Sequence, residues 1–193
     1  MSWEALVSVA RDLYRRSAEL WIPAISPADG FILSALAFTV CSGRGYVNMV
    51  DAGAGIGFST LFIAYGASRG CRGRLVAVEM DEGRFEELKR NTRILRDITG
   101  DSVAVEAVLG DALEYLDSVE DESLDLVFVD IEKSLYPEAA RILKGKLRRG
   151  GIAVFHNAIQ PKPPREFFEI VSKEFNSITI PTEAGILVAI KER

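Results

Sequence analysis

The chain has 193 residues, of which 48% are hydrophobic and 26% charged, and its formal net charge is −5. This balance is typical of a folded globular protein and excludes a disordered chain, while the acidic charge disfavours general binding to nucleic acid. Two cysteines, Cys41 and Cys71, are too few for a disulfide framework or a cysteine-only zinc site, and they indicate a reducing cytoplasm. No apolar run reaches the ~20 residues of a membrane span, and the charges within residues 1–21 exclude the apolar core of a signal peptide. We therefore expect a cytoplasmic protein with no membrane contact.

The apolar pattern predicts helices before residue 46 and alternating strands and helices after it. Apolar residues at three- and four-residue spacing favour a helix near the start of the chain. Ser26 and Pro27 suit the cap and the first position of a second helix. Strands are then predicted at 47–50, 74–78, 103–108, 124–129, 152–155, 177–180 and 186–190. Helices are predicted at 57–67, 81–98, 112–116, 135–147 and 165–175.

Short, continuously apolar strands that alternate with helices predict a parallel sheet covered on both faces. The last two strands have no helix between them and predict an antiparallel hairpin at the sheet edge. We expect one α/β domain over residues 1–193, with helices in 1–45 and a doubly wound, Rossmann-like, seven-stranded sheet in 46–193. Ligands of such sheets bind outside the carboxyl ends of the strands.

A glycine-rich loop, Asp51-Ala52-Gly53-Ala54-Gly55-Ile56-Gly57, joins the first predicted strand of the sheet to a helix. The dinucleotide fingerprint needs a further glycine at position 58, which is Phe58, so a dehydrogenase is disfavoured. The loop favours S-adenosylmethionine, because a carboxylate suits a helix N-terminus that carries the Ser59 hydroxyl. The alternative is a glycine-rich turn that serves helix–strand packing only.

Acidic residues follow the next two predicted strands. Glu79 ends the second strand, where a carboxylate can hydrogen-bond a ribose; the alternative is a solvated strand end. Asp111, in Gly110-Asp111-Ala112, either accepts a hydrogen bond from an adenine amino group or caps the following helix.

These motifs resemble those of the S-adenosylmethionine-dependent O-methyltransferases of the catechol and caffeoyl-CoA type. The resemblance runs from about Pro27 to the end of the chain and rests on segments 51–60, 78–81, 110–112, 125–130 and 150–157, with Lys133 and Tyr136. It implies the class I methyltransferase fold and a bound S-adenosylmethionine. It further implies that Ser59 binds the methionine carboxylate, that Glu79 binds the ribose, and that Met80 and Asp111 contact adenine. Further implied cofactor contacts are Asp51, Gly53, Ala54, Gly55, Gly57, Ala112 and Asp130.

A second group of polar residues follows strands four and five. Asp130 closes the fourth strand and His156-Asn157 closes the fifth, so their side chains are expected at the ligand-binding edge. Carboxylate and amide oxygens suit Mg²⁺ or a similar cation, and such a cation lowers the pKa of a hydroxyl that it coordinates. The resemblance implies that Lys133 is the general base.

The family pattern ends strand five with Asp-Asn, whereas this chain has His156-Asn157, and His156 is its only histidine. Three hypotheses follow. His156 remains a ligand with Asp130 and Asn157 and shifts preference toward Mn²⁺, Zn²⁺ or Fe²⁺. Alternatively, His156 is itself the catalytic base. In the third, metal binding is lost and His156 only hydrogen-bonds a neighbour.

The predicted reaction is methyl transfer to an oxygen of a small aromatic hydroxyl acceptor, with Lys133, Asp130 and His156 as the catalytic candidates. Two alternatives remain: methylation of hydroxylated tRNA bases, as in some relatives, and cofactor binding without turnover. The tRNA alternative is supported by a cluster of basic residues, Arg141, Lys144, Lys146, Arg148 and Arg149. The alternative interpretation, without any ligand, is that these residues form a solvated helix end where positive charges are favoured. A homodimer is also expected.

Overall fold

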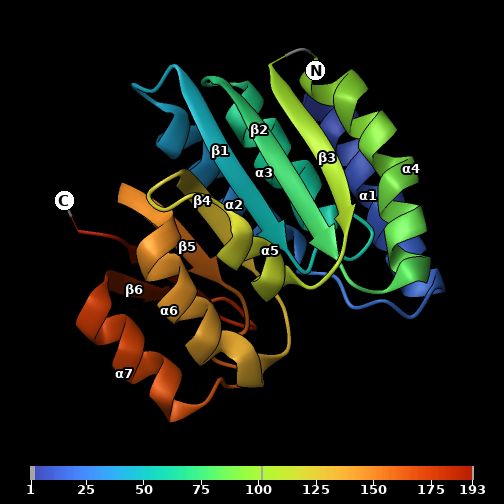
Figure 1. The fold of residues 1–193 in the computed structure, drawn as a ribbon. Helices are drawn as coiled ribbons and strands as arrows, with labels where there is room; N and C mark the ends of the chain where they lie inside the picture. The colour runs from blue at the N-terminus through green and yellow to red at the C-terminus, as the bar shows by residue number, and fades with distance from the viewer. Residues whose placement is uncertain (1–2, 101, 193) are drawn as a thin grey trace.

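The computed structural model describes residues 3–100 and 102–192 and contains one seven-stranded sheet (Figure 1). Its strand order is β3-β2-β1-β4-β5-β7-β6. The first five strands in the chain pair in parallel, and β7 pairs antiparallel with β5 and with β6. The parallel sheet and the antiparallel C-terminal hairpin are thus confirmed. The strands are β1 Tyr46–Ala52, β2 Arg72–Glu79, β3 Val103–Leu109, β4 Leu124–Val129, β5 Leu147–Phe155, β6 Asn176–Ile180 and β7 Ile186–Ile190.

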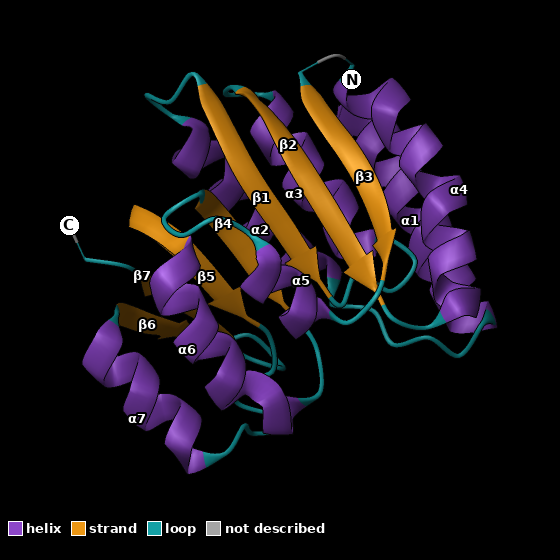
Figure 2. Ribbon diagram, viewed as in Figure 1, coloured by secondary structure: helices purple, strands orange, loops and turns teal. Residues whose placement is uncertain are grey.

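Helices cover both faces of the sheet (Figure 2). Side chains of α1 to α4 pack on one face, and those of α5 to α7 pack on the other. Ser26 caps α2 and Pro27 is its first residue, as the sequence predicts. The helices are α1 Trp3–Glu19, α2 Pro27–Cys41, α3 Phe58–Ser68, α4 Glu82–Thr99, α5 Ala112–Ser118, a short 3₁₀ turn η1 Lys133–Leu135, α6 Tyr136–Lys146 and α7 Arg165–Glu174. Among the described residues, no helix is both long enough and apolar enough to cross a bilayer.

Strand β4 shows why the central strands are continuously apolar. Leu126 and Phe128 pack into the cluster on the α1–α4 side, and Val127 and Val129 pack into the cluster on the α5–α7 side. Since successive side chains of a strand point to opposite faces, a strand covered on both faces must be apolar at every position.

Strand β5 begins at Leu147, five residues before the predicted start at Ile152. Its pairing with β4 is irregular between Leu124 and Leu126, and Gly150 has a φ of +72°. The pair Gly150-Gly151 interrupts the apolar pattern, so the local pattern does not indicate that the strand continues through it.

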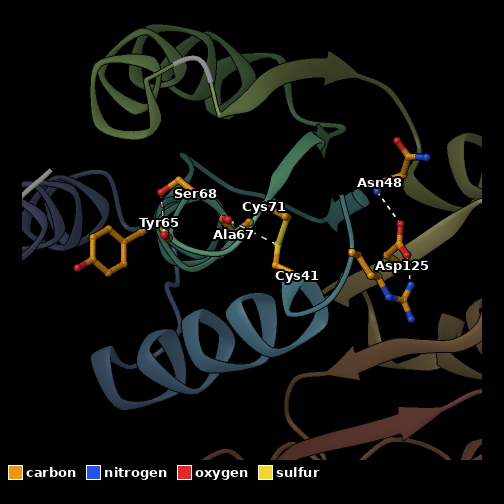
Figure 3. The surroundings of a disulfide bond; sticks show 8 residues. Cys41, Asn48, Tyr65, Ala67, Ser68, Cys71 and Asp125 are labelled. Carbon is orange, nitrogen blue, oxygen red and sulfur yellow. Dashed lines mark hydrogen bonds and ion pairs between the residues drawn. A yellow bond between two sulfur atoms is a disulfide. The ribbon is translucent and has the colours of Figure 1, made fainter. Parts of the chain in front are cut away.

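Cys41 and Cys71 form a disulfide bond (Figure 3). Cys41 ends α2 and Cys71 lies just before β2, and their Cα atoms are 5.2 Å apart, inside the usual range of roughly 4.4–6.8 Å. The two cysteines therefore do not support the expected reducing cytoplasm, and that location stays a prediction. The sequence does not reveal the pairing, because residues 30 positions apart in the chain meet only through the packing of α2 on α3.

Loss of this disulfide is expected to lower the free energy of unfolding by about 3–4 kcal/mol, because the bond closes a loop of 30 residues in the unfolded chain. Urea unfolding of oxidised and reduced protein, and of a Cys41→Ala/Cys71→Ala variant, measures this. Ligand binding at the carboxyl ends of the strands should not change, since Cys71 lies at the amino end of β2. Equal unfolding midpoints for the oxidised and reduced proteins would contradict the expectation.

Candidate functional site

A cavity of about 970 Å³ lies where the loops leave the carboxyl ends of β1 to β5. It is lined by residues that directly follow five strands and by part of the segment before β1. This is the edge at which the sequence predicts the ligand site. The lining includes Gly53, Gly55, Glu79, Met80, Asp111, Ala112, Asp130, Lys133, His156, Asn157 and, from the N-terminal helices, Asp29.

The glycine loop after β1 is held against β2 and β4. The backbone N–H groups of Gly53 and Ala54 both donate to the carbonyl of Val78, at 3.0 Å. Gly53 has a φ of +88°, and a Cβ atom there would lie 2.4 Å from the Asp130 carbonyl oxygen. Only glycine fits this position, so the loop brings bare backbone to the cavity wall.

Asp51 is fully buried beneath this loop and accepts two hydroxyl hydrogen bonds. Ser59 Oγ and Thr60 Oγ1 donate to Asp51 Oδ2 at 2.8 and 2.5 Å. Burial raises the pKa of Asp51 to about 6, although the two hydroxyls act to lower it. The structure thus turns the Ser59 hydroxyl toward Asp51, and Ser59 does not line the cavity. Its contact with a methionine carboxylate stays a prediction.

The raised pKa of Asp51 makes its effect on stability depend on pH. A carboxyl whose pKa is higher in the folded state stabilises the fold below its ordinary pKa of 3.8, and this contribution is lost as pH rises through about 6. Between about pH 4 and 7.5 the wild type should therefore lose about 2 kcal/mol of stability that an Asp51→Asn variant does not lose. Urea unfolding of both proteins at the two pH values measures the difference, in which the other titrating groups cancel. Parallel pH profiles would contradict this assignment.

Glu79 organises the loop from the end of β2. Its Oε2 accepts the Gly55 N–H at 2.8 Å and its Oε1 accepts the Asp81 N–H at 3.0 Å. The buried carboxylate lines the cavity, so the alternative of a solvated strand end is wrong. Met80, 71% exposed, lies beside it on the cavity wall.

Asp111 caps α5. Its Oδ1 accepts the N–H groups of Leu113 and Glu114 at 2.7 and 3.1 Å, which confirms the capping alternative. Both Asp111 and Ala112 also line the cavity. Asp111 is therefore accessible to a ligand in the cavity, and its contact with adenine stays a prediction.

The residues that follow β4 and β5 form a charged cluster. Lys133 Nζ donates to Asp130 Oδ1 at 2.7 Å and to the Ile131 carbonyl at 2.9 Å. His156 Nδ1 lies 3.3 Å from Asp130 Oδ2. Burial acts to raise the pKa of Asp130, but His156 and Lys133 outweigh it and hold that pKa below its ordinary value. The Asn157 amide instead donates to the Gln160 carbonyl at 2.8 Å.

Asp29 completes this cluster, and sequence reasoning missed it as a site residue. It lies in the first turn of α2, is 1% exposed, and its Oδ2 lies 3.3 Å from His156 Nε2. The Ser26 hydroxyl donates to the same oxygen at 2.8 Å. Burial acts to lower the pKa of His156, but Asp130 and Asp29 outweigh it and raise that pKa.

Residues 50–158, more than half of the chain, match a family model described as a methyltransferase domain. The chain belongs to this methyltransferase family. A catechol O-methyltransferase of Mycobacterium tuberculosis is 31% identical over 144 residues, which cover 75% of this chain and 61% of that protein. A relative from Mycobacterium ulcerans is 28% identical over 158 residues, which cover 82% of this chain and 65% of that protein. The chain thus spans less than two thirds of the length of these curated relatives.

Solved methyltransferases share the fold over almost the whole chain. An O-methyltransferase from Bacillus cereus, in complex with SAH, superposes with a TM-score of 0.77 at 22% identity and covers 96% of this chain and 91% of that chain. TomG from Streptomyces achromogenes, an O-methyltransferase in complex with SAM, gives 0.76 at 22% identity and covers 100% of this chain and 92% of that chain. These likenesses confirm the predicted class I methyltransferase fold.

The residues that the sequence predicts to hold a metal do not fit a divalent cation. An ammonium group, Lys133 Nζ, occupies one oxygen of Asp130, and both ring nitrogens of His156 face carboxylates. The Asn157 side chain is turned to Gln160. Across residues 3–100 and 102–192, no three His, Cys, Asp or Glu side chains are grouped as a metal site requires.

Proposed function

We propose that the protein is an S-adenosylmethionine-dependent O-methyltransferase that acts on a small aromatic hydroxyl acceptor. The observation that carries this proposal is that the glycine loop, Glu79 and the Asp130–Lys133 pair face one cavity. The names of the relatives, O-methyltransferases that include a catechol O-methyltransferase, support the same chemistry.

The cofactor would lie along the β1–β3 side of the cavity. It would be held there by the backbone of Gly53 and Gly55 and by Glu79, which would bind the ribose. Met80 and Ala112 would lie beside the adenine. S-adenosylmethionine supplies an electrophilic methyl group. The protein's contribution is to hold an acceptor oxygen in line with that group, which by itself accounts for much of the rate in such reactions.

Lys133 is the residue best placed to bind the acceptor oxygen. An ammonium group has three N–H donors, and the structure uses two of them on Asp130 and Ile131. The third is available to an oxygen in the cavity, where the positive charge favours the deprotonated hydroxyl. The hydroxyl proton would pass to solvent, the oxygen would bond to the methyl carbon as its bond to sulfur breaks, and neutral S-adenosylhomocysteine would leave. Lys133 thus stabilises the charge that develops on the attacking oxygen.

Transfer of a labelled methyl group from S-adenosylmethionine to a panel of catechols and related phenols tests the proposal. We expect incorporation into at least one phenol and none in the Glu79→Ala variant. Binding of S-adenosylmethionine without transfer to any hydroxyl compound would instead favour a cofactor-binding protein without turnover.

The tRNA alternative is not favoured by the surroundings of the basic cluster. Four of its five members pair with carboxylates of the fold: Arg141 with Glu166, Lys144 with Glu174, Lys146 with Asp121, and Arg148 with Asp125. The cluster ends at the amino end of β5, whereas the cavity lies at the carboxyl ends of the strands. Four of the five charges are therefore paired within the fold, and the whole cluster is remote from the site.

Reversal of the exposed charge in Arg149→Glu is accordingly expected to leave turnover of a phenol unchanged, and bulk tRNA should accept no methyl groups. Assays over a series of salt concentrations check this. Methylation of tRNA with a steep salt dependence that flattens in Arg149→Glu would establish the tRNA alternative instead.

A further inference from the structure

Binding of the methyl donor does not explain the side chains packed around His156. Two carboxylates, Asp29 and Asp130, face opposite nitrogens of one imidazole, and Lys133 lies on the far oxygen of Asp130. Asp29 reaches this position from α2, outside the matched methyltransferase region of residues 50–158.

We propose that the protein orients its methyl acceptor without a metal ion, using Lys133 as the fixed positive charge and Asp29 as a positioning residue for His156. This inference rests on the proposed function and concerns the residues that orient the methyl acceptor in the same cavity.

Lys133 occupies the place that a cation on Asp130 would need. Its Nζ lies 2.7 Å from Asp130 Oδ1, and the ammonium is held a second time by the Ile131 carbonyl. It also lies 5.1 Å from the centre of the Tyr136 ring, which favours a positive charge there. A divalent ion bound to Asp130 would lie beside this charge and be repelled by it.

Asp29 fixes the orientation of the imidazole. Its buried Oδ2 faces His156 Nε2 at 3.3 Å, and the Ser26 hydroxyl holds the same oxygen at 2.8 Å. This contact leaves Nδ1 at the cavity, 3.3 Å from Asp130 Oδ2, so that each ring nitrogen faces a carboxylate. A buried carboxylate that holds one ring nitrogen fixes the orientation of the ring and thereby determines which nitrogen faces Asp130.

The wild-type protein allows a direct test, because His156 is its only histidine. Tag-free protein labelled with ¹⁵N in the imidazole, saturated with S-adenosylhomocysteine, is titrated with Zn²⁺ and separately with Mn²⁺. We expect unchanged His156 resonances at millimolar metal and unchanged turnover of the accepted phenol in excess chelator. A saturable shift with Zn²⁺ or broadening with Mn²⁺, absent in Asp130→Asn, would overturn the inference.

The Asp29→Asn variant tests the positioning role, with Asp12→Asn on the exposed side of α1 as the matched control. In Asp29→Asn, kcat should fall by about 10–100-fold and the His156 resonances should shift, while the Kd of S-adenosylhomocysteine stays the same. Asp12→Asn should change none of the three. Unchanged kcat and resonances in Asp29→Asn would remove Asp29 from the site.

The proposed function and the inference of a metal-free acceptor site can fail independently of each other. If wild-type protein does not bind S-adenosylhomocysteine, the proposed function fails. If it binds that ligand and also binds a metal at His156, only this inference fails. Should Asp29→Asn not fold, the metal titration of the wild type still decides.

Discussion

Replacement of Glu79 by alanine is expected to weaken the binding of S-adenosylhomocysteine by about 100-fold or more. The carboxylate accepts two backbone N–H groups, those of Gly55 and Asp81, and each buried donor left without a partner costs about 1–3 kcal/mol. The loop that should cradle the cofactor would therefore lose its conformation in addition to the direct ribose contact. Calorimetric titration measures the effect.

Two further variants sharpen the result for Glu79. Glu79→Gln keeps one oxygen acceptor but places an amide N–H₂ where the second acceptor was, so we expect an intermediate loss of affinity. Glu82→Ala, an equivalent change at an exposed position of α4, should bind like the wild type. Affinity of Glu79→Ala within a few-fold of wild type would refute the role given to Glu79.

Replacement of Lys133 by methionine is expected to lower kcat by about 10²–10³-fold while leaving the affinity for S-adenosylhomocysteine intact. Methionine keeps most of the length of the side chain and removes only the charge and the N–H donors that hold Asp130 and the acceptor oxygen. The split between kcat and cofactor affinity separates this role from a structural one. Initial rates with the accepted phenol and calorimetry on the same preparation measure it.

Lys162→Met provides the control for Lys133, because Lys162 is an exposed lysine outside the cavity lining. Its turnover should equal that of the wild type. Full turnover of Lys133→Met would show that the acceptor is bound elsewhere.

The sheet could be predicted from the sequence because burial on both faces leaves a strong local signal. The predicted strand 124–129 coincides with β4, whose six residues are all buried. The late prediction of the start of β5 shows the limit of that signal, since Gly150 and Gly151 carry no apolar side chain although their backbone still exchanges hydrogen bonds with Lys191.

The residues that close the strands could be predicted as site residues for a similar reason. Glu79 is the last residue of a buried strand, Asp130 and His156 each directly follow one, and the carboxyl ends of parallel strands meet at one edge. The sequence therefore placed them at the cavity without any knowledge of side-chain contacts.

Contacts between segments that are distant in the chain could not be predicted from local sequence patterns. Asp29 has the local pattern of a first-turn residue in α2, and only the packing of that helix brings it to His156, 127 residues later. The disulfide of Cys41 and Cys71 depends on the same helix. The orientation of Ser59 was missed because its partner, Asp51, is a buried charge that local pattern does not reveal.

Calorimetric titration of tag-free wild-type protein with S-adenosylhomocysteine, and in parallel with NAD, tests the central claim most directly. We expect one site per chain for S-adenosylhomocysteine with a micromolar Kd, and no detectable binding of NAD, because Phe58 replaces the glycine that the dinucleotide fingerprint requires. Tighter binding of NAD than of S-adenosylhomocysteine, or no binding of the latter, would contradict it.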